Sequence, residues 1–177
     1  MTSKSRKRKE YLLEIMDVLR SENIYDTIDY CRQDEGKIKQ FIYPYLVEAL
    51  TNHYAKGPTK KDIDIARQKA RKNILWEGNK KTTVNNIVVF GVQHRPDMVI
   101  KDDDISIAIE IKKGDNGSDI RGGIGQSLIY STTYDFVLYL FIDTSADKKI
   151  LNSYNSEKES NLSIGLWDNY NIMFNIV

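Results

Sequence analysis

One central run constrains this chain more than any other feature: RPDMVIKDDDISIAIEIKK, at residues 95–113. Successive side chains of a β-strand point to opposite faces of its sheet, so residues two apart share a face. A strand here would have two dissimilar faces: Ile107, Ile109 and Ile111 on one, and Ala108, Glu110 and Lys112 on the other. The sequence therefore predicts a strand whose apolar side is buried and whose other side carries a carboxylate and an ammonium.

The residues before this strand predict a second strand that pairs with it. Residues 94–100 read as a strand, with Pro96 near its start, where a missing N–H is best tolerated. The acidic loop at residues 101–104 reads as the solvated tip of an antiparallel hairpin, and it is short enough for one. Such a hairpin would bring Asp97 beside Glu110, so that two carboxylates and a lysine converge.

Two carboxylates beside a lysine suit metal-assisted hydrolysis of a phosphodiester. Mg²⁺ is typically held by one or two carboxylates while it keeps waters and takes oxygens from a phosphate. The ion lowers the pKa of a bound water, and a nearby lysine can orient that water or stabilise developing charge. The His and Cys residues show no spacing typical of a zinc site.

These residues resemble the PD-(D/E)XK nuclease superfamily, which has the restriction-endonuclease-like fold. Pro96-Asp97 matches its first element, and Glu110-Ile111-Lys112 matches its second. A helix is predicted downstream over residues 123–134, followed by an apolar strand over residues 136–142. Many members carry a Gln and a Tyr four residues apart on that helix. Here the matching pair is Gln126 and Tyr130.

The resemblance implies a Mg²⁺-dependent nuclease, with Mn²⁺ as a possible substitute and DNA as the expected substrate. The expected metal ligands are Asp97, Glu110 and the carbonyl oxygen of Ile111. Lys112 would assist the attacking water, Gln126 would orient Lys112, the water or a phosphate, and Tyr130 would support Gln126 and contact the nucleic acid. Two alternatives stay open: a non-catalytic nucleic-acid-binding or assembly module with this fold, and a structural domain in which Glu110 and Lys112 form a surface ion pair.

Superfamily members often supply a further metal-site acid from a helix before the sheet. Glu48 is the candidate here, because it lies beside an apolar stripe at helical spacing in residues 38–50. Glu14 and Glu77 are its rivals. An ordinary exposed glutamate on a helix explains Glu48 equally well.

Formal net charge is only +1, from 26 basic and 25 acidic residues, so bulk charge does not indicate nucleic-acid binding. Two basic runs do indicate nucleic-acid binding. The candidate phosphate contacts are Lys4, Arg6, Lys7, Arg8 and Lys9 in the first run, and Arg67 and Arg71 in the second. A disordered tail accounts equally well for the first run, and a solubilising helix face accounts for the second.

A single α/β domain is expected over residues 1–177, with a mixed β-sheet flanked by helices. Residues 1–9 form the basic arm, residues 10–73 are mainly helical, and residues 74–177 form the sheet core. After the core strands we expect a helix at residues 146–154 and short strands at residues 162–167 and 171–177.

The chain has one cysteine, Cys31, which excludes an intramolecular disulfide framework. No apolar stretch approaches a membrane span, and the N-terminus lacks the apolar core of a signal peptide, so a cytoplasmic protein without a membrane partner is expected. A homodimer is plausible for a nuclease of this kind, because cutting both strands of a duplex needs two sites.

Overall fold

The computed structural model describes residues 3–25, 29–76, 78, 83–154 and 157–177. The elements follow one another in this order: α1 (Ser3–Leu19), α2 (Glu22–Tyr25), α3 (Glu35–Tyr54), α4 (Lys60–Asn73), β1 (Ile74–Trp76), β2 (Ile87–Val89), β3 (Val92–His94), β4 (Met98–Asp102), β5 (Ile105–Gly114), α5 (Gly117–Tyr130), β6 (Phe136–Asp143), α6 (Lys149–Tyr154), α7 (Glu157–Tyr170) and β7 (Ile172–Ile176). None of the helices in these ranges has both the length and the apolar character needed to cross a membrane.

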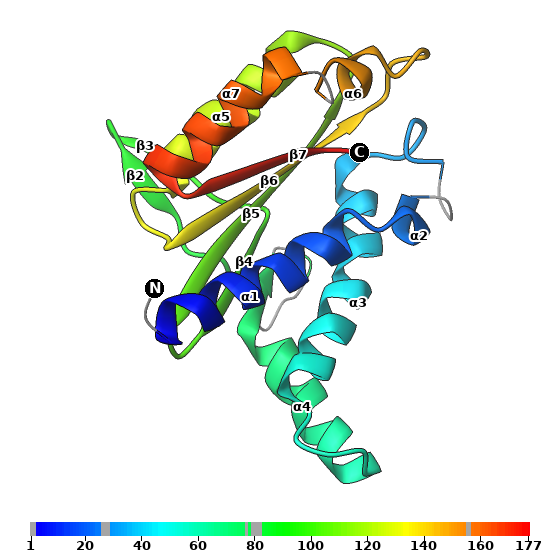
Figure 1. Cartoon of the computed structure of the whole chain (residues 1–177), viewed down its shortest axis with the longest axis vertical. Coiled ribbons are helices and arrows are strands. Elements are labelled where there is room, and N and C mark those ends of the chain that lie inside the picture. Colours follow the sequence, from blue (N-terminus) through cyan, green and yellow to red (C-terminus); the bar gives the residue numbers. More distant parts are fainter. Residues whose placement is uncertain (1–2, 26–28, 77, 79–82, 155–156) are drawn as a thin grey trace.

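The centre of the molecule is a five-stranded mixed sheet in the order β1-β4-β5-β6-β7. The pairs β1–β4 and β4–β5 are antiparallel, whereas β5–β6 and β6–β7 are parallel. Helices α1 and α3 cover one face of the sheet, and α5 and α7 cover the other (Figure 1). The predicted fold class, a mixed sheet flanked by helices with a helical N-terminal portion, is confirmed.

The alternation predicted for β5 is also confirmed. Ile107, Ile109 and Ile111 are fully buried in the core shared with α1 and α3, and Ala108 is fully buried in the core on the α5 side. Because helices cover both faces, Glu110 is buried as well, with 1% of its surface exposed. The expected pairing of β5 with the preceding strand is present too, with Met98 opposite Ile109.

Some predicted boundaries are wrong for local reasons. The strand predicted at residues 94–100 is interrupted: His94 ends β3, which pairs with β2 in a small hairpin, and β4 begins only at Met98. Helix α5 begins at Gly117, earlier than predicted, because the Asn116 side chain accepts hydrogen bonds from the backbone N–H groups of Ser118 and Asp119. Helix α6 is shorter than the predicted helix over residues 146–154.

The strand predicted at residues 162–167 is wrong, because these residues belong to α7. Leu162 and Ile164 suggested alternation with Leu166, but they are 46% and 54% exposed, whereas Leu166 is buried. Leu166 and Trp167 are the apolar side chains that α7 packs against the two cores, and such adjacent pairs are typical of a helix.

Candidate active site

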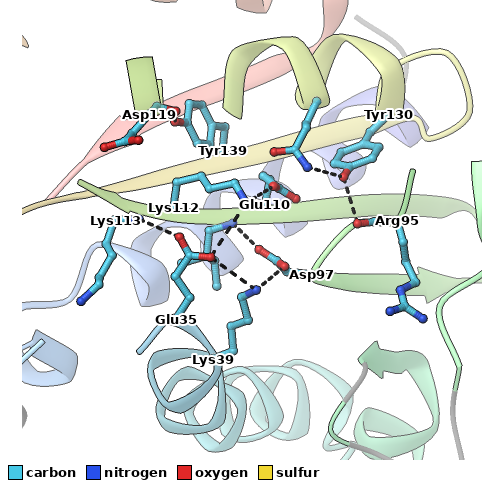
Figure 2. Close-up of polar contacts among 12 residues, drawn as sticks. Glu35, Lys39, Arg95, Asp97, Glu110, Lys112, Lys113, Asp119, Tyr130 and Tyr139 are labelled. Carbon is cyan, nitrogen blue, oxygen red and sulfur yellow. Dashed lines mark hydrogen bonds and ion pairs between the residues drawn. The ribbon is translucent and has the colours of Figure 1, made fainter. Parts of the chain in front are cut away.

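The start of β4 and the extension of β5 position Asp97. The register places Met98 opposite Ile109, so Asp97 comes to the level of Glu110. Strand β5 continues beyond this level to Gly114, which leaves its edge there without a paired strand on the β4 side. The Ile111 N–H donates a 2.8 Å hydrogen bond to Asp97 Oδ2 at this edge (Figure 2). Because the N–H and C=O of one strand residue point to the same edge, the Ile111 carbonyl lies on the Asp97 side too.

The carboxylate of Glu110 is buried. Neither carboxylate oxygen has a hydrogen-bond partner among the residues that the structure describes. Lys112 Nζ lies 3.2 Å from Oε1, an ion-pair contact whose geometry does not make a hydrogen bond. Burial and then the nearby charge of Asp97 raise the pKa of Glu110 to about 7. Its carboxylate therefore exchanges a proton near neutral pH.

Lys112 lies between two carboxylates. Its Nζ atom is 3.2 Å from Glu110 and 3.9 Å from Glu35 Oε2. Burial lowers the pKa of Lys112, but the charges of Glu110 and Glu35 outweigh burial, so the pKa ends above its ordinary value. Lys112 is therefore an ammonium at neutral pH, with a quarter of its side chain exposed.

Helix α3 contributes two residues that the sequence analysis missed. Lys39 Nζ forms an ion pair with Asp97 Oδ1, and Glu35 Oε1 accepts a 3.4 Å hydrogen bond from the Lys113 N–H (Figure 2). A local signal existed, since Asp34 caps the helix start and Glu35 and Lys39 are one turn apart. That signal does not say which strand edge the helix faces.

The structure does not bring Glu48 to this site. Glu48 is exposed and lines a groove between α3 and α4, 13 residues beyond Glu35 and thus about 20 Å farther along the helix axis. Glu14 lies 2.7 Å from His53 Nδ1, near the far end of α3. Glu77 is outside the described residues. The helix acid that does lie near Lys112 is Glu35.

Tyr130 is close to the two carboxylates but not accessible to a nucleic acid. It is fully buried, and its hydroxyl donates a 2.9 Å hydrogen bond to the Arg95 carbonyl. Burial, followed by the charges of Glu110 and Asp97, raises the pKa of Tyr130. Gln126 Nε2 donates to the Tyr130 hydroxyl at 3.5 Å. The pair therefore ties α5 to the segment that leads into Asp97.

The basic arm is the first part of α1, which begins at Ser3. The side chain of Lys4 is outside those described, and Lys7 and Lys9 are exposed. Arg6 is paired with Glu10 at 2.9 Å, and Arg8 with Asp135 at 2.5 Å. Arg8 thus binds another part of the chain, whereas Lys7 and Lys9 remain accessible.

The donor set fits a hard cation. No group of three or more His, Cys, Asp or Glu side chains close enough to hold a metal occurs among the described residues. Two carboxylates suffice for Mg²⁺, which commonly keeps several waters. The buried oxygens of Glu110, which accept no hydrogen bond from the described residues, and the neighbouring Asp97 provide such a set.

No protein-family model matches this chain, and no curated protein matches it at a significant level. Among solved structures, it is similar to one titled "Restriction endonuclease PspGI-substrate DNA complex". The TM-score is 0.35 and the sequence identity 15%, over 96% of this chain and 76% of that chain. Similarity at this level establishes neither a shared function nor a shared set of site residues.

Proposed function

We propose that this protein is a Mg²⁺-dependent nuclease that hydrolyses phosphodiester bonds in DNA. The observation that carries the proposal is the buried carboxylate of Glu110, which forms an ion pair with Lys112, accepts no hydrogen bond from the described residues and lies beside Asp97. A buried charge without hydrogen bonds costs stability unless it serves a ligand or a reaction. A cation at this position would offset that cost.

Asp97 and Glu110, with the Ile111 carbonyl, would hold Mg²⁺ or Mn²⁺. The ion would neutralise phosphate charge and lower the pKa of a water at the site. Lys112 is an ammonium, so it would donate hydrogen bonds to the charge that develops on the phosphate and to the attacking water. Glu35 would keep Lys112 in place, and Lys39 would orient Asp97. Gln126 would act through Tyr130, to which it is hydrogen-bonded.

The test is a cleavage assay on labelled duplex, flap, junction and single-stranded DNA with Mg²⁺, Mn²⁺ or EDTA. Asp97→Ala and Glu110→Ala should each abolish metal-dependent cleavage, with a loss of at least about a hundredfold. Lys112→Ala should slow cleavage by a similar factor but leave Mn²⁺ binding, measured by calorimetry, largely intact.

Full activity in Asp97→Ala would refute the assignment. DNA binding without cleavage of any substrate under any metal condition would instead favour the non-catalytic binding module. Sedimentation of the protein alone and on a duplex would test the homodimer that we propose for cutting both strands.

A further inference from the structure

A groove between α3 and α4 is not used by the proposed chemistry. It has a volume of about 560 Å³. Val47 and Ile63 are apolar residues of its lining, and Tyr43, Arg67 and Arg71 add one aromatic and two cationic side chains. Helices that pack directly lie roughly 8–10 Å apart, so a groove between them is narrower than a nucleic-acid duplex.

The groove begins beside the candidate active site. Tyr43 lies one helical turn after Lys39, which pairs with Asp97. The Tyr43 ring stacks on Trp76, with ring centroids 5.1 Å apart and planes 21° apart. Trp76 is opposite Met98 in the sheet, and Met98 is the residue after Asp97. The Tyr43–Trp76 pair therefore connects the lining of the groove to the strand that pairs with β4 next to Asp97.

The charge of the groove suits a phosphate backbone. Arg67 and Arg71 are one turn apart on α4, which places their Cβ atoms roughly 5–6 Å from each other. The side chain of Arg67 is half exposed and forms a long ion pair, 3.7 Å, with Asp64. Arg71 has no carboxylate partner within the described ranges. Glu48 is the acid among the lining residues, so the lining is positive on balance. Guanidinium groups bind phosphates in bidentate fashion.

We propose that this groove holds an unpaired strand of the substrate next to the cleavage site. The backbone would lie against Arg67 and Arg71, and a base would stack on Tyr43, as in other proteins that bind single strands. This inference rests on the proposed nuclease function and makes it more specific. The substrate class it names is DNA with a single-stranded arm, such as a flap or a fork, rather than a continuous duplex.

Binding in EDTA tests the groove independently of cleavage. Fluorescence anisotropy would compare a labelled fork with a duplex of the same length. The double variant Arg67→Ala/Arg71→Ala should weaken fork binding by at least about tenfold and duplex binding by less than about twofold. Lys61→Ala/Lys72→Ala removes the same charge from exposed positions of α4 that do not line the groove, and it should affect both DNAs equally and slightly.

Trp76 provides a second readout. The chain has two tryptophans, so Trp167→Phe leaves Trp76 as the remaining one. A single-stranded arm that stacks at Tyr43 should quench the fluorescence of Trp76, and Arg67→Ala/Arg71→Ala should remove this quenching. The groove proposal would be overturned if the arginine variant weakened fork and duplex binding equally, or if it behaved like the lysine control. Cleavage by the wild type would still support the nuclease in that case. If fork binding needed both arginines but no substrate were cleaved, the groove would be supported and the nuclease function would be wrong.

Discussion

Glu110 has 1% of its surface exposed and accepts no hydrogen bond from the described residues, so keeping its carboxylate charged costs free energy that the ion pair with Lys112 offsets only in part. The ordinary pKa of this group is 4.5, and burial and Asp97 raise it to about 7. Between these two pH values the folded state binds more protons than the unfolded state, so the free energy of unfolding falls as pH rises. Glu110 therefore lowers stability at neutral pH in the absence of a metal.

Glu110→Gln should remove this pH dependence, because an amide keeps the shape of the side chain without its charge. In EDTA at pH 8 the variant should exceed the wild type in free energy of unfolding by about 3 kcal/mol, whereas at pH 4 the two should be nearly equal. Urea unfolding across this range measures the difference. Glu48→Gln, at an exposed position, is the control and should retain the wild-type pH dependence. A constant difference at every pH would contradict the buried-charge explanation.

Glu35 and Glu48 separate the two possible roles of an acid on α3. Glu35 lies 3.9 Å from Lys112 and accepts a hydrogen bond from Lys113, so Glu35→Gln should disturb the proposed cation site. Loss of such a supporting carboxylate should raise the half-saturating Mg²⁺ concentration for cleavage by about tenfold. Glu48→Gln should leave this concentration unchanged. If Glu48→Gln alone raised it, the assignment of Glu35 would be wrong.

At the scale of elements, the approach of α5 to β6 places Gln126 and Tyr130. A Cβ atom on Gly123 would lie 2.2 Å from Cζ of Tyr139, so the absence of a side chain allows the helix to approach this closely. The Tyr139 hydroxyl donates a 3.3 Å hydrogen bond to the Ile120 carbonyl in the same region. The helix can therefore dock in this position only with glycine at residue 123.

Gly123→Ala should lower the free energy of unfolding by about 1–3 kcal/mol, because the methyl group displaces α5 or Tyr139. Cleavage should also fall, since Gln126 and Tyr130 move with the helix. Gly122→Ala is a matched control: apart from its own stretch of helix, no described atom lies within 4 Å of the added Cβ, and alanine should stabilise the helix by roughly 0.5–1 kcal/mol. Thermal unfolding of the two variants measures this difference. Similar stability in both would show that the close approach of Gly123 to Tyr139 does not limit the docking of α5.

At the scale of the whole molecule, α1 connects the basic arm to the sheet. Arg8 is 2.5 Å from Asp135 and lies over the Phe136 ring at 5.5 Å, next to the start of β6. The neighbouring cations Arg6, Lys7 and Lys9 are exposed to solvent. The arm therefore combines a structural contact with an accessible positive surface.

Arg6→Ala/Lys7→Ala/Lys9→Ala should reduce the slope of log binding constant against log salt by about 0.9 for each lost phosphate contact on duplex DNA. The free energy of unfolding of this triple variant should remain that of the wild type. Arg8→Ala should do the opposite, lowering the free energy of unfolding by about 1 kcal/mol without changing the salt slope. A salt slope unchanged in the triple variant would exclude the arm from the nucleic-acid interface.

Much of this fold follows from local pattern in the chain. The alternation in β5, its pairing with the strand after Asp97 and the buried stripe of α3 were all predictable, because period and turn length act over a few residues. The neighbourhood of Asp97, Glu110 and Lys112 follows from the same local geometry. The alternation in residues 162–167 gave a wrong prediction of a strand, since strand and helix patterns overlap in a short apolar run.

Only the packed molecule decided which helix residues join these strands. Lys39 lies 58 residues before Asp97 and contacts it, and Glu35 contacts Lys112 and Lys113, because α3 crosses the edge of β5 that has no paired strand. The same packing determines that Glu48 lines a groove, that Tyr130 is buried and that Arg8 pairs with Asp135. Periodicity shows that a helix has an apolar face, but the edge or groove that its polar residues meet depends on contacts between segments far apart in the chain.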